Sequence, residues 1–230
     1  MRRTAIHTWQ DRLRDPSLSV LLILELGVVF VAVPLAAQGL PTARAIGETI
    51  VLAVVVIVGA LSHRRGALLV ILVGLGATFA SVWLRPDLPT VAESLLSRGG
   101  SIMTFSALSW DVAHAVYAPG RITFQRLQGA FVLYLNRGTI FASAFHLIWD
   151  LSPGAFTNVG TPARGPSEIA LMLYFSFTTL TSTGFGDIVP VNPFARSLAN
   201  LEAVLGQLYL ATTVARLVTL ELADRRRERL

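Results

Sequence analysis

The chain has 230 residues, of which 53% are hydrophobic and only 14% charged, and its mean hydropathy is +0.61. Average soluble chains carry about 25% charged residues, so this composition excludes an ordinary soluble domain and predicts a membrane protein. All 19 basic residues are Arg, a bias typical of GC-rich bacterial genes. The net charge of +5 is spread over the ends of the apolar segments, which indicates membrane orientation and no nucleic-acid partner.

The first half of the chain contains four apolar segments that can cross a bilayer, whose core requires about 20 residues. They follow a basic segment, residues 1–16, that lacks the features of a cleaved signal peptide. We expect the spans at 18–37, 45–61, 66–84 and 100–116, the last in a helix that can begin near Thr90. Glu25 lies in the first span, where exposure to lipid would cost roughly 2.5–3.5 kcal/mol. We therefore expect it to face other helices and form a structural hydrogen bond.

The second half contains two longer apolar segments separated by a short one. The fifth span is expected at 127–149 and carries Arg137, and the sixth is expected at 194–220. Between them, Ser167 can cap a short helix that has Glu168 in its first turn and runs to about Thr179. At 1.5 Å per residue this helix is too short to cross the bilayer. It must enter and return on the same side, which requires protein or water around its loop.

A loop of nine residues at positions 179–187 follows the short helix and reads Thr-Leu-Thr-Ser-Thr-Gly-Phe-Gly-Asp. Gly184 and Gly186 are two positions apart, so the backbone at both can adopt positive φ. If conformations alternate along 182–186, successive carbonyls can point to one side. Four such strands around an axis would form rings of oxygens that replace the water shell of a cation. Gly-Phe-Gly-Asp alone could be an ordinary turn, but its place between the short helix and the last span favours the ion-binding interpretation.

The loop resembles the signature of the potassium channel superfamily, a hydroxyl residue followed by Val-Gly-Tyr-Gly-Asp. Ser182 stands where the family usually has Thr, and Phe185 where it usually has Tyr. Thr183 replaces the usual Val, and its polar side chain could change the packing behind the loop. Three residues match without change: Gly184, Gly186 and Asp187. The resemblance covers the second half of the chain well, and the first half is similar only in outline to bacterial six-helix channels with one pore loop.

The resemblance implies an all-α membrane protein with six transmembrane helices and a re-entrant pore helix and selectivity-filter loop between helices five and six. It divides the chain into a four-helix N-terminal membrane domain at 1–120, a pore domain at 121–223 and a basic cytoplasmic tail at 224–230. Because one chain supplies one pore loop and a ring needs four, it also implies a homotetramer in the lipid bilayer. K⁺ would be the permeant ion, with no cofactor and no enzymatic activity.

The resemblance also assigns roles to individual residues of the loop. The selectivity filter would comprise Thr181, Ser182, Thr183, Gly184, Phe185, Gly186 and Asp187. Within it, K⁺ would be bound at Ser182, Thr183, Gly184 and Phe185.

The sixth span carries further candidate residues. Gly206 lies 20 positions after Gly186, where the resemblance implies the bend point of the inner helix. A small residue that allows close helix packing would explain it equally well. We expect Glu202 to lie behind the filter, near Thr178 or Thr179, and to hydrogen-bond the pore helix as support for the filter. Three side chains share a face beside the glycine and would line a cavity: Gln207, Leu210 and Val214.

The arginines predict the orientation of the chain. With a cytoplasmic N-terminus, 12 arginines lie in inside segments and 5 in outside loops, which favours two cytoplasmic termini. The protein would then be a multi-pass protein of the plasma membrane, the inner membrane of a bacterium, with the loop at Asp187 on the outer side.

The fourth helix lacks the Arg at every third position that a voltage sensor requires. Starting from Arg98, those positions hold Ser101, Thr104, Ala107 and Trp110. We therefore expect no conventional voltage gating. Asp111 and His114 share a face of this helix, where a proton-sensitive pair is possible and a plain interhelical hydrogen bond is favoured.

Two alternative functions are considered, a channel without K⁺ selectivity and an enzyme. A nonselective cation channel of the same fold would follow if Thr183 loosened the filter. Gly-x-Gly-Asp is also a motif of intramembrane aspartyl proteases, which need two carboxylates that share a proton. In that family the second acid follows a Tyr, whereas Asp111 and Asp150 each follow a Trp, and the Pro-Ala-Leu segment of that family is missing.

Overall fold

The computed structural model describes residues 18–39, 65–84, 89–117, 124–157 and 166–228. In the first half, residues 18–37 form one helix whose middle is a π-helical segment, Val28–Ala32, followed by α2 at Val33–Ala37. Two long helices follow, α4 at Arg65–Trp83 and α5 at Thr90–Val116. The predicted start of the fourth helix near Thr90 is confirmed. The predicted second span, 45–61, lies outside the described residues.

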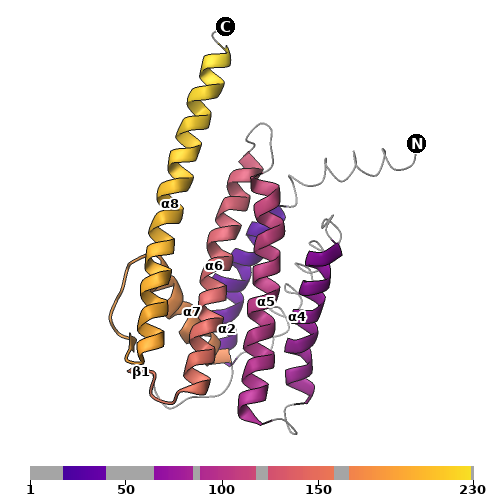
Figure 1. The fold of residues 1–230 in the computed structure, drawn as a ribbon, viewed down its shortest axis with the longest axis vertical. Coiled ribbons are helices and arrows are strands. Elements are labelled where there is room, and N and C mark those ends of the chain that lie inside the picture. The colour runs from indigo at the N-terminus through magenta and orange to yellow at the C-terminus, as the bar shows by residue number, and fades with distance from the viewer. Residues whose placement is uncertain (1–17, 40–64, 85–88, 118–123, 158–165, 229–230) are drawn as a thin grey trace, which may run out of the picture.

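In the second half, α6 spans Phe124–Leu151, α7 spans Pro166–Leu180 and α8 spans Pro193–Glu228. Two short strands, β1 at Phe156–Thr157 and β2 at Val189–Pro190, form an antiparallel pair that sequence patterns did not predict. Because α7 begins at Pro166, Ser167 lies inside its first turn and is not its cap. α8 is longer than the predicted sixth span and includes most of the predicted tail, projecting past the bundle in Figure 1.

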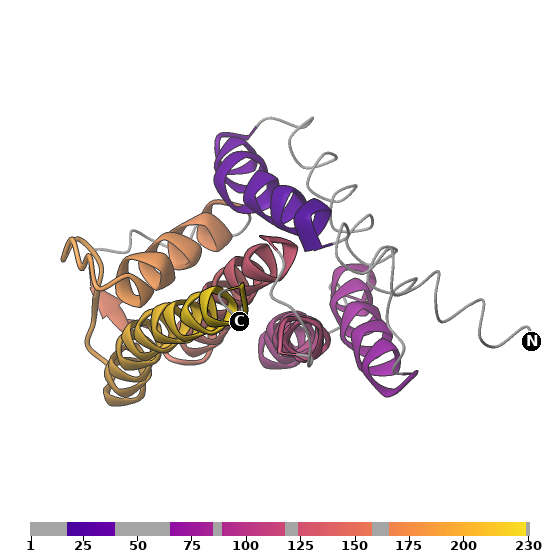
Figure 2. The same ribbon diagram turned by 90° about the horizontal axis from the view of Figure 1, so that it is seen from above.

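The helices pack as a layered bundle in which α5 contacts both α4 and α6. Viewed from above, α7 and α8 lie at one side of this bundle and α4 at the other (Figure 2). α7 contacts α6, α8 and the first helix, so the short helix is surrounded by longer ones.

Two helices among the described residues are long and apolar enough to cross a membrane, Leu18–Ala37 and Phe124–Leu151. They coincide with the predicted first and fifth spans. The apolar parts of two others are shorter, Gly66–Ser81 and Ser167–Leu180. The second of these is the helix that the sequence predicts to enter and return.

An aromatic core holds α7 against α6. The ring centroid of Phe145 lies 4.9 Å from that of Phe175 and 6.1 Å from that of Phe156, in edge-to-face arrangements. Phe156 and Phe175 complete the triangle at 5.4 Å. Such pairs are each worth about 0.5–1.5 kcal/mol beyond the area they bury. The core therefore fixes α7, and with it the start of the loop that follows.

Glu25 does not form the expected hydrogen bond within the described part of the chain. Its side chain is buried, and neither carboxylate oxygen has a hydrogen-bond partner among the described residues. His114 Nδ1 lies 2.8 Å from the Trp110 carbonyl of its own helix, so this contact is not interhelical.

Candidate functional site

The loop after α7 has a backbone in which left-handed residues alternate with ordinary ones. Ser182, Gly184 and Gly186 have φ values of 55°, 54° and 78°. The two glycines thus have the positive φ that their spacing predicts. Ser182 is the only non-glycine residue with positive φ in the described part of the chain. The alternating pattern expected for 182–186 is therefore present.

The amides of the loop turn back toward the C-terminus of α7. The N–H groups of Thr183 and Gly184 both donate to the carbonyl of Thr178, at 2.8 and 3.1 Å, and Ser182 N–H donates to Thr179 O at 2.9 Å. The last carbonyls of a helix have no partner inside the helix, so the loop satisfies them. Thr178 and Thr179 support the loop through their backbone oxygens, while both hydroxyls donate to Phe175 O.

Side-chain hydroxyls at the base of the loop are paired. Thr181 Oγ1 donates to Phe177 O at 2.7 Å and lies 2.8 Å from Thr183 Oγ1. The polar group at the position of the usual Val therefore has a partner within the same loop. Gln207 of α8 donates from Nε2 to Ser182 Oγ at 2.9 Å, which links the inner helix to the loop.

The far end of the loop is held by a tyrosine of α7. Tyr174 OH donates to Asp187 Oδ2 at 2.8 Å, and Ile188 N–H donates to Asp187 Oδ1 at 3.0 Å. The Tyr174 ring also stacks on Phe185, with centroids 6.2 Å apart and an interplanar angle of 5°. The hydrogen bond to Asp187 raises the pKa of the Tyr174 phenol above its ordinary value.

Glu202 of α8 contacts α7 at Ser176, two to three residues before the threonines near which the sequence placed it. Ser176 Oγ lies 2.5 Å from Glu202 Oε1 and 2.7 Å from the carbonyl oxygen of Gly138 in α6. All of this is buried. A serine hydroxyl has one hydrogen, and a carbonyl only accepts. Both contacts are satisfied when Ser176 donates to Gly138 and a protonated Glu202 donates to Ser176.

Gly206 lies where α8 approaches the end of α7. A Cβ at this position would be 2.1 Å from the backbone oxygen of Leu180. Contacts below 3.0 Å require movement of the backbone, so the absence of a side chain permits this approach. The helix continues through Gly206 without interruption. Of the expected cavity residues, Gln207 and Leu210 are exposed in the single chain, and the Val214 side chain lies outside the description.

The loop itself faces away from its own chain. Every residue from 181 to 187 is exposed, and Phe185 is 70% exposed. Ile188, the next residue, is buried in the aromatic core. A loop that is anchored at both ends and exposed along its length is suited to contact something outside the chain.

Three contacts of the site were not foreseen from the sequence. Tyr174 was not singled out, although its position 13 residues before Asp187 puts it on the last turns of the short helix. Ser176 was read as part of an apolar run. Arg137 was noted without a role, and its guanidinium lies 4.7 Å over the Tyr209 ring and donates to Leu205 O at 3.4 Å. It thus connects α6 to α8.

Comparisons with known proteins find relatives among ion channels, and the family match covers the same region. A family model described as an ion channel matches residues 130–221. The inward rectifier potassium channel Kirbac3.1 of Paramagnetospirillum magnetotacticum is 31% identical over 87 residues, which are 36% of this chain and 25% of that protein. The potassium voltage-gated channel protein shk-1 of Caenorhabditis elegans is 33% identical over 75 residues, 33% of this chain and 14% of its own.

The chain therefore spans a quarter or less of the length of these two relatives. No solved structure is significantly similar to it. The matched segment contains most of α6, all of α7, the anchored loop and most of α8. Through residues 130–221, the chain is thus similar to ion channels, and both of the relatives named above are potassium channels.

Proposed function

We propose that four copies of this chain form a potassium-selective channel that conducts K⁺ passively. The filter is the loop from Thr181 to Asp187, and the carbonyls of residues 182–185 bind the ion. The observation that carries this proposal is the alternation of left-handed residues at 182, 184 and 186. The N–H groups of 183 and 184 are directed to Thr178. The carbonyls of the same two trans peptide units, those of residues 182 and 183, therefore point to the opposite side, as a ring of ion ligands requires.

The exposure of the loop in one chain supports a homotetramer. A single strand cannot surround an ion, and the exposed residues 181–187 would become the lining of a pore shared by four chains. Purified protein in mild detergent should then have about four times the mass of one 24.8 kDa chain, apart from detergent. A monomer that still conducts would contradict the proposal.

We propose further that the chain crosses the membrane six times, with both termini cytoplasmic and α7 with its loop entering from the outer side. The Arg distribution and the apolar helices support this arrangement. Because the fourth helix lacks an Arg repeat, little charge crosses the field. Open probability should vary only weakly with voltage, in contrast to the steep response given by about 3–4 gating charges in each subunit.

A nonselective cation channel is the alternative that one residue specifically favours. Thr183 places a hydroxyl where the family usually has a methyl group, although Thr181 accepts that hydroxyl as a partner. The decisive measurement is the reversal potential in mixed K⁺ and Na⁺ across a reconstituted bilayer. We expect K⁺ preference in wild type and a stronger preference in Thr183→Val.

The matched control is Thr139→Val in α6, whose hydroxyl bonds only within its own helix, to Leu135 O. This change should leave the reversal potential where it is. Equal permeability to both ions in wild type and in Thr183→Val would overturn the potassium assignment and leave a nonselective pore.

The protease alternative is disfavoured by the contacts of the acids. Both oxygens of Asp187 accept hydrogen bonds, from Tyr174 and Ile188. Asp150 forms an ion pair with Arg98. A proton-sharing pair of carboxylates would require Asp187 to face a second carboxylate, whereas its oxygens face Tyr174 and the Ile188 amide. The match of residues 130–221 to an ion channel family also points away from an enzyme.

A further inference from the structure

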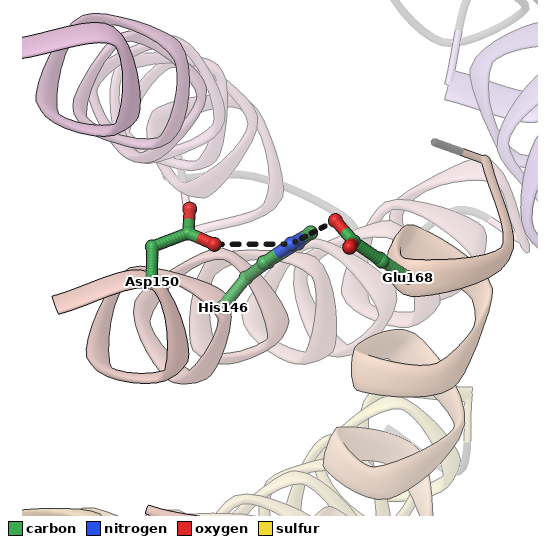
Figure 3. A group of neighbouring side chains, drawn as sticks. All are labelled: His146, Asp150 and Glu168. Atoms are coloured by element: carbon green, nitrogen blue, oxygen red, sulfur yellow. Dashed lines mark hydrogen bonds and ion pairs between the residues drawn. The ribbon is translucent and has the colours of Figure 1, made fainter. Parts of the chain in front are cut away.

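A cluster of three metal-ligating side chains lies away from the filter, where α6 ends and α7 begins. His146 and Asp150 are four residues apart on one face of α6, and Glu168 lies in the first turn of α7. His146 is 2% exposed and Glu168 8%. Their ligand atoms all lie within 4.8 Å of one another. Figure 3 shows the imidazole between the two carboxylates, with each carboxylate facing the same ring nitrogen.

The distances resemble the edges of a tetrahedral metal site. His146 Nε2 is 3.2 Å from Glu168 Oε2 and 3.8 Å from Asp150 Oδ1. Metal–ligand bonds of about 2.0–2.2 Å in tetrahedral geometry put neighbouring ligand atoms roughly 3.3 Å apart. Small side-chain rotations would therefore bring the three atoms around one ion, and a water molecule would supply the fourth ligand.

Arg98 of α5 places a positive charge beside His146 and Asp150 of this cluster. Its terminal nitrogen lies 3.0 Å from His146 Nε2, and its Nε lies 3.5 Å from Asp150 Oδ2. Arginine only donates, so His146 Nε2 accepts from Arg98 and presents a lone pair. The same nitrogen then cannot donate to Glu168, which faces it at 3.2 Å. The lone pair of His146 Nε2 and a lone pair of Glu168 Oε2 therefore face each other beside the Arg98 guanidinium.

The hold of Arg98 on the cluster is incomplete. Within the described residues, Arg98 Nε has no hydrogen-bond partner despite its distance of 3.5 Å to Asp150. A divalent ion would neutralise both carboxylates and use the Nε2 lone pair directly. The ligand set of one imidazole and two carboxylates suits Zn²⁺ and its transition-metal neighbours.

We propose that His146, Asp150 and Glu168 form a binding site for Zn²⁺, which the ion occupies by displacing Arg98. Asp150 is the most exposed of the three, with 22% of its side-chain surface accessible, and offers the entry path. Occupation would fasten the end of α6 to the start of α7 and release the contacts of Arg98 with His146 and Asp150. The site is independent of ion conduction, so its test does not require an open channel.

The test is calorimetric titration of the purified full-length protein in detergent with ZnCl₂. Wild type should bind about one Zn²⁺ per chain, and Zn²⁺ should raise its thermal unfolding midpoint. His146→Gln should lower the affinity at least about tenfold, since even outer-shell changes cost that much. The matched control is His114→Gln on the exposed face of α5, which should bind as wild type does.

Arg98→Gln separates this site from a merely structural ion pair. Removal of the competing charge should raise the Zn²⁺ affinity roughly tenfold or more, a gain that a misfolded variant could not give. Absence of Zn²⁺ binding in wild type, or equal binding in His146→Gln, would overturn the proposal. So would weaker binding in a folded Arg98→Gln, because the arginine would then be holding the ligands in place.

Discussion

The helices of residues 65–117 and those of residues 124–228 are held together by different kinds of contact. α4 and α5 cross backbone to backbone, since a Cβ at Gly100 would lie 2.5 Å from the Gly74 carbonyl oxygen. α6, α7 and α8 share a close approach at Gly206 and an aromatic core. They are joined in addition by buried polar side chains, above all Ser176 between Gly138 and Glu202. Close backbone packing is the usual way in which membrane helices associate, whereas a buried hydrogen-bond network also fixes one geometry.

The two kinds of contact correspond to different tasks, because only the second half positions the loop at 181–187. No side chain of α4 and α5 needs a defined place for the loop at 181–187. In the second half, the same helices that bury the network also hold Thr178, Tyr174 and Gln207, which contact the loop directly. The network therefore transmits the position of α6 and α8 to the filter. Changes of equal local severity should then have unequal effects on conduction in the two halves.

The largest effect is expected from Gly186→Ala. Gly186 has φ of 78°, and an L-residue in that conformation costs roughly 1–2 kcal/mol. In the proposed tetramer, four such loops would surround one pore and multiply the effect, so selective K⁺ flux into proteoliposomes should be lost. Gly154→Ala is the matched control, because Gly154 has φ of 80° with open space around it, in the turn before β1. Its strain is similar but lies outside the filter, and flux should persist. Loss of flux in both variants would show that strain anywhere in this half disables the protein.

The next largest effect is expected from Gly206→Ala. The new Cβ would meet Leu180 O at 2.1 Å, and overpacking typically costs about 1–3 kcal/mol. α8 must move away from the end of α7, so conduction should fall strongly. Gly100→Ala makes a comparable clash with Gly74 O in the first half. It should lower thermal stability to a similar degree and reduce conduction much less. Equal losses of current would remove the distinction between the halves.

Much of the helical arrangement was predictable, because the ends of a long apolar run mark the ends of a helix that can cross a membrane. The first, third, fourth and fifth helices begin and end within a few residues of the predicted positions. The exceptions depend on contacts between distant residues. The β1–β2 pair joins Phe156 to Pro190 across the whole pore segment, and strands of two residues leave no pattern in the sequence.

The candidate site was predictable at positions where the backbone conformation requires one type of residue. Gly184 and Gly186 have left-handed conformations that glycine adopts without strain. Their spacing in the sequence therefore predicts the backbone conformation of the loop. Side-chain partners were less predictable. Glu202 was placed two to three residues too near the loop, because spacing in the sequence alone does not fix the position of α8 along α7. The cluster at His146 joins three helices, and no local pattern brings Arg98 to it.

A smaller effect is expected from changes at Glu202. Glu202→Ala removes the donor to Ser176 and leaves a buried gap, a loss of roughly 1–3 kcal/mol in the free energy of unfolding. Glu202→Gln keeps a donor, in its amide group, and should cost less than about 1 kcal/mol. Thermal unfolding of the detergent-solubilised protein would measure both. If Glu202→Gln were as destabilising as Glu202→Ala, the carboxyl would be ionised and the assigned direction of the hydrogen bond wrong.

The smallest effect is expected from Tyr174→Phe. The change keeps the ring that stacks on Phe185 and removes only the hydroxyl that donates to Asp187. K⁺ selectivity should survive, while current should decline faster during sustained opening, because the outer end of the loop is less firmly held. Single-channel recordings of both proteins would measure this difference.

The pH dependence of that difference tests its cause. The bond to Asp187 raises the pKa of Tyr174 above its ordinary value of 10.0. A raised tyrosine pKa gives stability that is fully present below pH about 10 and lost as the pH rises through the folded-state value. The difference between wild type and Tyr174→Phe should thus be constant from about pH 6 to about pH 9. A difference that disappeared within that range would mean that another group controls the outer end of the loop. The hydrogen bond would then be incidental, and ring stacking alone would connect α7 to the filter.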